Sequence, residues 1–151
     1  MEIWFYHLQS QPLERALPTL VEKAAARGWR VIVQTVDDLR LKTIDDLLWT
    51  YSPESFLPHG TSREANAARH PVLLTTEAGN ANAAALRMYV EGAEVDLEPG
   101  SATYERVILL FDGGNDEELA GARRQWSRLK GQGFALAYWQ QGDDGRWTRQ
   151  M

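Results

Sequence analysis

Short apolar runs separated by helix-like segments make up most of this chain. Six runs predict strands, at residues 2–8, 29–35, 71–75, 85–90, 105–111 and 134–140. Several are apolar almost throughout, as in V-L-L at 72–74 and V-I-L-L-F at 107–111. Continuous apolar character is typical of strands buried on both faces of a parallel sheet.

Two helices are predicted in the first third of the chain. The first starts at Leu13, with Ser10 as its N-cap and Pro12 in its first turn, and Gly28 ends it. Its apolar positions fall on one helical face: Leu13, Leu17, Leu20, Val21 and Ala24. The second opens at Asp37 and Asp38, and its apolar side is predicted to consist of Leu39, Ile44, Leu47 and Leu48.

The last predicted helix spans 116–130 and is followed by Gly131 and Gly133. Acids occupy its start and bases its end, which matches the helix dipole. Strands alternating with helices predict an α/β fold with a mostly parallel central sheet and helices on both faces. We expect a single domain over 1–151, an exposed connection at 60–70, an acidic surface excursion at 92–103, and an edge hairpin or tail at 142–151.

The segment 47–60 is unusually rich in aromatic residues. Pro53 and Pro58 predict irregular backbone here, so Trp49, Tyr51 and Phe56 are expected on a loop. Such a loop either seals one end of the core or meets a partner, because aromatic anchors dominate interface energetics.

Composition narrows the functional classes. The 151 residues are 44% hydrophobic and 25% charged and contain no cysteine, which excludes disulfides, thiolate metal sites and a cysteine nucleophile. A net charge of −5 argues against broad, direct binding to nucleic acid, so any basic site must be local. No signal sequence or membrane span is evident, and a cytoplasmic location is expected.

The turns after the strands show no nucleotide-binding motif. Gln9 to Pro12 stands where a G-x-G-x-x-G loop would lie, and no P-loop is present. The D-G-G-N turn at 112–115 could hold an anion at a helix start, although Asp112 and the acids behind it would repel phosphate. The three histidines lack metal-ligand spacing, and we expect no active site and no cofactor.

The last helix carries a candidate binding face. Steps of 100° place Leu119, Ala122, Trp126 and Leu129 in a stripe facing the sheet. Arg123, Ser127 and Lys130 flank the stripe, and Arg124 and Arg128 lie on the outer face. This pattern is typical of a solvated helix end with dipole-matched bases, and it also suits a receptor for an acidic peptide with an aromatic side chain or terminal carboxylate.

Several segments together resemble the chi subunit family of bacterial DNA polymerase III. They include F-Y-H-L (5–8), D-D-L-L-W-T-Y-S-P-E-S-F-L-P-H-G (45–60), E-R-V-I-L-L-F-D-G (105–113) and A-R-R-Q-W-S-R-L-K-G-Q-G-F (122–134). They occur in family order over nearly the whole chain. The central L-W-x-x-x-x-x-S-F-x-P-H-G is the most specific of them.

The resemblance implies a non-catalytic adaptor in DNA replication. Chi proteins pair one-to-one with the psi subunit, which ties them to the clamp loader, and they bind the acidic C-terminal tail of single-stranded-DNA-binding protein. By position, Trp49 and Phe56, extended by Leu57 and Pro58, match the psi-facing surface. Arg123 matches a cationic position for the tail with Trp126 beside it, while Arg124, Arg128 and Lys130 are added from the helix face alone.

Two features modify this expectation. Leu119 and Ser127 stand where some family members carry bases, which predicts a tail site that is weaker or displaced toward Arg124 and Lys130. The aromatic patch could also serve another partner, such as a helicase. Contact with DNA is expected to be indirect, and no membrane contact is expected.

Two rival functions remain open. One is a small-ligand or nucleotide-binding α/β enzyme that uses the Asp112 turn. The other is a direct binder of single-stranded DNA that stacks bases on the six tryptophans, against which the net charge and the lack of a basic groove in the sequence both argue.

Overall fold

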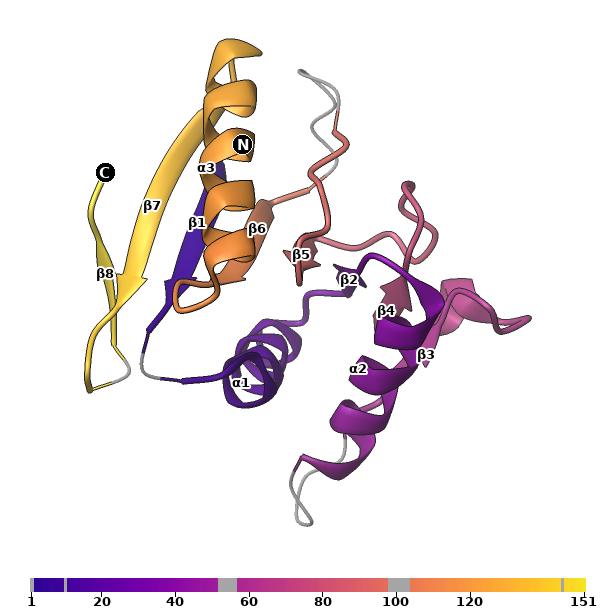
Figure 1. The fold of residues 1–151 in the computed structure, drawn as a ribbon. Coiled ribbons are helices and arrows are strands. Elements are labelled where there is room, and N and C mark those ends of the chain that lie inside the picture. Colours follow the sequence, from indigo (N-terminus) through magenta and orange to yellow (C-terminus); the bar gives the residue numbers. More distant parts are fainter. Residues whose placement is uncertain (1, 10, 52–56, 98–103, 145) are drawn as a thin grey trace.

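The computed structural model describes residues 2–9, 11–51, 57–97, 104–144 and 146–151, and a mostly parallel sheet forms its centre (Figure 1). The eight strands of this sheet have the order β3-β4-β2-β5-β6-β1-β7-β8. Neighbours are parallel except β7 and β8, which pair antiparallel as an edge hairpin. The strands are β1 (Glu2–Leu8), β2 (Val31–Gln34), β3 (Gly60–Thr61), β4 (Val72–Thr75), β5 (Leu86–Val90), β6 (Arg106–Asp112), β7 (Ala135–Gln141) and β8 (Trp147–Arg149).

The helices cover both faces, as the alternation of strands and helices predicted. Helices α1 (Leu13–Ala26) and α2 (Asp38–Thr50) lie on one side, and α3 (Asp116–Gly131) lies on the other (Figure 1). Each face has its own apolar core, because successive strand residues point to opposite faces. In β1, Tyr6 and Leu8 join the α1 and α2 core, whereas Ile3 and Phe5 join the α3 core.

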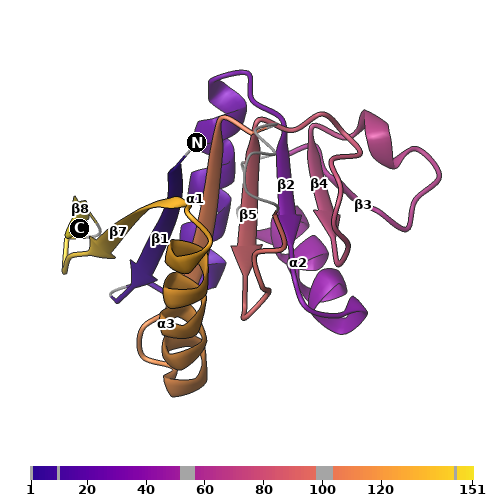
Figure 2. The ribbon, with the colours of Figure 1, turned by 90° about the horizontal axis from the view of Figure 1, so that it is seen from above.

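Strands β5 and β6 fit between β2 and β1, although they come later in the chain. The connection through α1 therefore steps over two strand positions that the chain fills afterwards (Figure 2). All the parallel strands end at the same edge of the sheet, where ligand clefts of open α/β folds form.

Two expectations about helix starts and faces are wrong. Pro12, not Ser10, is the N-cap of α1, and Ser10 lies outside the described residues. In α2, Asp37 caps the helix by accepting a hydrogen bond from Arg40 N at 2.8 Å. Leu41, Ile44 and Leu48 form its buried stripe, whereas Leu39 is 73% exposed, because it lies about 200° around the helix from Leu41.

Helix α2 also runs further than expected. It continues to Thr50, so Trp49 lies in its last turn and not on irregular backbone. Pro53 and Phe56 lie outside the described residues. Of the three aromatic residues expected on a loop, Trp49 is therefore helical and Tyr51 is the C-cap of the helix.

The two connections predicted as surface segments contain structure. Residues 60–70 include β3, which adds a strand to the sheet, and the short 3-10 helix η1 (Ala67–Arg69). The segment after β5 is not a surface excursion at its start, because Ala93 and Val95 are buried. Gln125 holds it by accepting from Val95 N at 2.8 Å, while residues 98–103 lie outside the described part.

Arg87 of β5 is fully buried and organises the part of the sheet that α3 does not cover. Its Nε donates to Tyr89 Oη (3.0 Å), and its Nη1 donates to Gly79 O (2.7 Å) and Tyr104 Oη (3.1 Å). Its Nη2 donates to Glu77 O (2.8 Å) and to Gln34. The guanidinium thus uses every donor it has, which is the condition for burying a charge at tolerable cost.

The counter-charge for Arg87 is Asp96, which lies two hydrogen bonds away, through Tyr89 or Gln34. Asp96 accepts from Tyr89 Oη at 2.8 Å and from Gln34 Nε2 at 3.3 Å. Burial raises the pKa of Tyr89 well above its ordinary value, so its hydroxyl stays protonated and links the two charges. The network ties residues 77–79, 96 and 104 to β2 and β5.

We expect Arg87→Leu to lower the free energy of unfolding by about 3 kcal/mol or more, because it leaves several buried acceptors without donors. Urea unfolding followed by circular dichroism would measure the change. Arg69→Leu on the exposed η1 is the matched control and should stay within about 0.5 kcal/mol of wild type. An equally small effect at Arg87 would contradict the structural role of the network.

Candidate functional site

A pocket of about 330 Å³ lies between α3 and the neighbouring strands β1, β6 and β7. Strand register explains its floor, because Phe5 lies opposite Tyr138 and His7 lies opposite Phe111. Aromatic side chains from three adjacent strands therefore project on the same face, under α3. The pocket is lined by Phe5, Phe111, Leu119, Ala122, Arg123, Trp126, Ser127, Tyr138 and Met151.

The walls of this pocket are mainly aromatic. The Trp126 ring meets the Phe5 ring edge-on at 5.1 Å between centroids and the Tyr138 ring at 6.0 Å. Such edge-to-face contacts hold Trp126 in place as part of the wall. Arg123 is the one base among the lining residues, which include no acid, and it is exposed. The arrangement suits a ligand group that is apolar with a negative charge at its end.

His7 and Tyr138 form a polar contact under this site. His7 Nδ1 lies 2.5 Å from Tyr138 Oη, which confirms that His7 is a hydrogen-bonding residue at the strand end. Burial lowers the pKa of His7, the nearby Asp112 carboxylate raises it, and Arg123 lowers it further. Burial raises the pKa of Tyr138, and Arg123 opposes that shift. The positive charge of Arg123 therefore acts on the floor of the pocket.

The sequence identified only part of this pocket. The stripe of Leu119, Ala122, Trp126 and Leu129 packs on the α3 core, and Arg123 and Ser127 flank it, as predicted. Phe5, Phe111 and Tyr138 were not predicted, because no local pattern shows which strands become neighbours. Their register in the sheet places them there.

The other predicted bases are not brought together with Arg123. Arg124 lines a different cleft, and Arg128 Nη2 donates to Val95 O at 2.8 Å, so Arg128 does not lie free on the outer face. Lys130 is exposed and is not among the lining residues, since it lies two turns beyond Arg123. The four bases predicted for the tail site are therefore divided between different surfaces.

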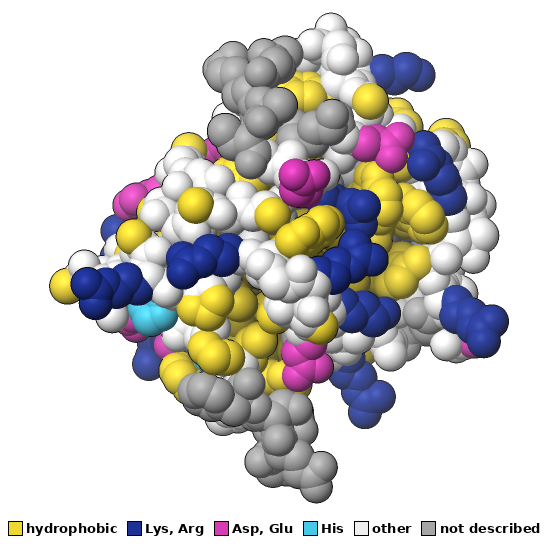
Figure 3. All heavy atoms as spheres, turned by 180° about the vertical axis from the view of Figure 1, so that it is seen from behind, with side chains coloured by type: hydrophobic (Ala, Val, Ile, Leu, Met, Phe, Trp, Pro, Cys, Tyr) yellow, Lys and Arg dark blue, Asp and Glu magenta, His cyan; other side chains and the backbone are white. Residues whose placement is uncertain are grey.

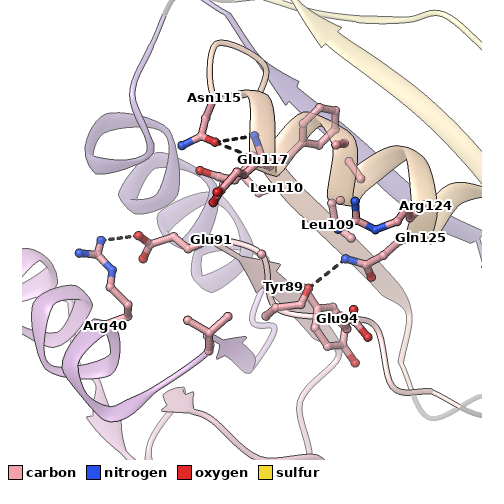
Figure 4. Close-up of a pocket in the computed structure, with 18 of the residues that line it drawn as sticks. Arg40, Tyr89, Glu91, Glu94, Leu109, Leu110, Asn115, Glu117, Arg124 and Gln125 are labelled. Carbon is pink, nitrogen blue, oxygen red and sulfur yellow. Dashed lines mark hydrogen bonds and ion pairs between the residues drawn. The ribbon is translucent and has the colours of Figure 1, made fainter.

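A larger cleft of about 790 Å³ lies at the carboxyl edge of the sheet (Figure 4). Arg40 and Glu91 form an ion pair across it, and Tyr89, Glu94, Arg124 and Gln125 line its far side. Acids outnumber bases among its lining residues, the acids being Asp37, Glu91, Glu94, Asp116, Glu117 and Glu118 and the bases being Arg40 and Arg124. This charge balance disfavours a phosphate-bearing ligand.

The backbone N–H groups of the D-G-G-N turn beside this cleft already donate to acceptors within the chain. Gly113 N donates to Leu8 O (3.0 Å), Gly114 N to Asp112 Oδ1 (2.9 Å), and Asn115 N to Asp112 O (3.1 Å). The Asn115 side chain also caps α3 by accepting from Glu117 N and Glu118 N. These donors are used within the chain, so the alternative of an enzyme that binds a nucleotide at Asp112 loses its geometric support.

The aromatic segment after α2 is partly core and partly surface. Trp49 is 49% exposed and Pro58 is exposed, whereas Leu57 is only 5% exposed and belongs to the α1 and α2 core. Leu57 therefore cannot extend an accessible patch, and Phe56 lies outside the described residues.

His59 secures the backbone of this segment. Its Nδ1 contacts Leu57 O at 2.7 Å, and its Nε2 contacts Asp45 Oδ1 at 3.0 Å. The Trp49 ring packs against the His59 ring at a tilt of 45°, with 4.2 Å between centroids. The prediction that His59 locks this turn is confirmed. The His59 ring also contacts one side of the Trp49 ring.

Comparison with known proteins points to one family. The family model described as "DNA polymerase III chi subunit, HolC" matches residues 1–137. A protein named "Probable DNA polymerase III subunit chi", from Rickettsia prowazekii (strain Madrid E), is 24% identical over 111 residues. That match covers 71% of this chain and 67% of the Rickettsia protein. Within the described residues, no helix is long and apolar enough to cross a membrane.

We expect stability to fall as the pH drops through the range where free histidine titrates, near pH 6.5. The pKa of His7 is lowered in the folded state, so the unfolded chain binds this proton more readily and acidification favours unfolding. The contribution of His7 to the free energy of unfolding is fully present above the ordinary histidine pKa. It is lost as the pH falls through the lowered pKa of the folded state. Thermal unfolding at several pH values should show a shallower loss for His7→Gln than for wild type. Identical pH profiles would contradict this assignment.

Proposed function

Because the chain belongs to the DNA polymerase III chi subunit family, we propose that it is a non-catalytic adaptor of the replication machinery. It would join the psi subunit, and through psi the clamp loader, to the acidic C-terminal tail of single-stranded-DNA-binding protein. Bacterial DNA replication takes place in the cytoplasm, which is where such an adaptor would act. No cofactor takes part in this function.

The observation that carries the proposal is the single cation on the rim of the apolar pocket under α3. A terminal carboxylate would pair with Arg123, and a charge-assisted hydrogen bond of this kind is about twice as strong as a neutral one. The aromatic side chain beside that carboxylate would enter the pocket between Trp126 and Tyr138. The family resemblance implies bases at positions 119 and 127 in some members; with Leu119 and Ser127 there, Arg123 would be the main electrostatic contact.

The proposed psi surface lies in the other helical layer. Trp49 is at the end of α2, whereas Arg123 is on α3, across the sheet (Figure 1). Both partners could therefore bind at once. An adaptor that binds psi and the protein tail at the same time would raise the effective concentration of the polymerase at template coated with single-stranded-DNA-binding protein. Neither contact has to be tight for this effect.

A synthetic acidic peptide that ends in an aromatic residue and a free carboxylate should bind the protein in a calorimetric titration. Arg123→Ala should weaken binding at least about tenfold, the cost of one hydrogen bond to a charged group. Arg124→Ala is the matched control, because it removes the same charge from the adjacent position but outside the pocket, and it should change affinity by less than about twofold. Equal losses in the two variants, or no binding at low salt, would reject the tail site.

Trp49→Ala should reduce capture of co-expressed psi, because a half-exposed tryptophan is the type of residue that anchors interfaces. Leu39→Ala removes a more exposed apolar side chain from the first turn of the same helix and serves as the control. Affinity purification followed by quantification of psi would distinguish the two variants. Undiminished capture by Trp49→Ala would place the psi surface elsewhere.

A further inference from the structure

A groove of about 140 Å³ lies at the edge of the sheet where strands β2, β5 and β6 begin, beside the C-terminal end of α1. It is separate from the pocket under α3 and from the acidic cleft, which share none of its lining residues. Its distinguishing members are three bases and three aromatic residues: Lys23, Arg27, Arg106, Tyr6, Trp29 and Trp147.

The groove is positive in a chain whose net charge is −5. Its lining includes no acid, and within the part of the chain that the structure describes no carboxylate forms an ion pair with Lys23, Arg27 or Arg106. The acid nearby on β1, Glu2, is held by Trp4 Nε1 (2.7 Å) and Arg149 Nη2 (2.9 Å). Seen from this side, Lys and Arg side chains gather in the middle of the molecule beside hydrophobic patches (Figure 3).

A row of aromatic rings continues from the groove across the open sheet face toward β8, with the Arg106 guanidinium packed among them. The Arg106 guanidinium lies 3.7 Å from the Trp4 ring centroid and 5.7 Å from the Trp29 ring. The Trp4 ring lies 4.9 Å from the Trp139 ring, and the Trp147 ring is stacked on Tyr6 at 4.3 Å. All four tryptophans are partly exposed.

We propose that this groove binds a single-stranded nucleic acid directly. Phosphates pair with Lys23, Arg27 and Arg106, and bases stack on the row of rings beside them. Each nucleotide supplies both a charge and a flat ring, which matches the way cations and rings alternate here. An acidic peptide would match the bases but would leave most of the ring row without a partner.

The overall charge of the chain does not oppose this site. Electrostatic attraction to phosphate acts over roughly a Debye length, which is about 8 Å at physiological ionic strength, so local charges decide. The sequence alone argued against nucleic-acid binding because no basic groove was visible in it. Lys23 comes from the last turn of α1, Arg27 is its C-cap and Arg106 comes from β6, and only the fold joins them.

The test is fluorescence anisotropy of a labelled oligothymidylate of about 20 nucleotides, longer than the roughly 4–16 nucleotides that one small binding module covers. Titrations between about 50 and 200 mM salt give the slope of log K against log salt, which is about −0.7 for each phosphate neutralised on a single strand. Lys23→Gln with Arg27→Gln should make the slope shallower by about 1.4, the value for two lost phosphate contacts, and weaken binding at low salt.

Arg15→Gln with Lys42→Gln is the matched control. It removes the same charge from exposed positions near the starts of α1 and α2, and Arg15 lies about 12 Å along the helix from Lys23. Its slope and affinity should remain those of wild type. Trp29→Leu should weaken binding while leaving the slope unchanged, because it removes stacking and no charge.

Three results would overturn the proposal. The first is no binding of the oligothymidylate at low salt by protein that circular dichroism shows to be folded. The second is an equal effect of the groove variant and its control. The third is displacement of the oligothymidylate by an acidic peptide as effectively as by unlabelled oligothymidylate, which would make the groove a peptide site. None of these results depends on Arg123 or Trp49, so failure here leaves the adaptor proposal standing.

Discussion

A parallel sheet has to be buried on both faces, and this chain covers its sheet with α1 and α2 on one face and α3 on the other. The strands at the centre, β5, β6 and β1, carry apolar residues toward both cores and cannot be left open on either side. Helix α3 covers only the part of its face over β6, β1 and β7. The remainder needs another cover, and the segment after β5 supplies it.

Arg87 of β5 holds part of that cover. A charged residue on a central strand would ordinarily destabilise the core, yet every donor of its guanidinium is used. Two donors bind Gln34 and Tyr89 of the strands, two bind the backbone of residues 77–79, and one binds Tyr104 in the segment after β5. The polar network thus covers the part of this face that α3 leaves open. Gln125 of α3 holds the same segment from the other side, so the helix and the network share one boundary.

The proposed binding surfaces lie where helical cover ends. The pocket with Arg123 lies beside α3 over the register pairs of β1, β6 and β7, and the tryptophan row lies where α1 leaves the face near β8 uncovered. Trp49 stands at the end of α2. Incomplete cover leaves aromatic side chains partly exposed, and large aromatic residues at such places are the usual anchors of interfaces.

The sequence by itself determined six of the eight strands, the three helices and the α/β class, because these depend on apolar periodicity within a few residues. It also determined the family, through motifs that run along nearly the whole chain. Where local and tertiary signals differ, as at Leu39, Leu57 and the end of α2, the sequence interpretation was wrong.

Only the tertiary structure decided which residues share a surface. It joined Phe5, Phe111 and Tyr138 into one pocket, separated Arg124 and Arg128 from Arg123, and brought Lys23 and Arg27 beside Arg106. The physical reason is that strand order and register are set by pairing between segments far apart in the chain. No local pattern carries that information.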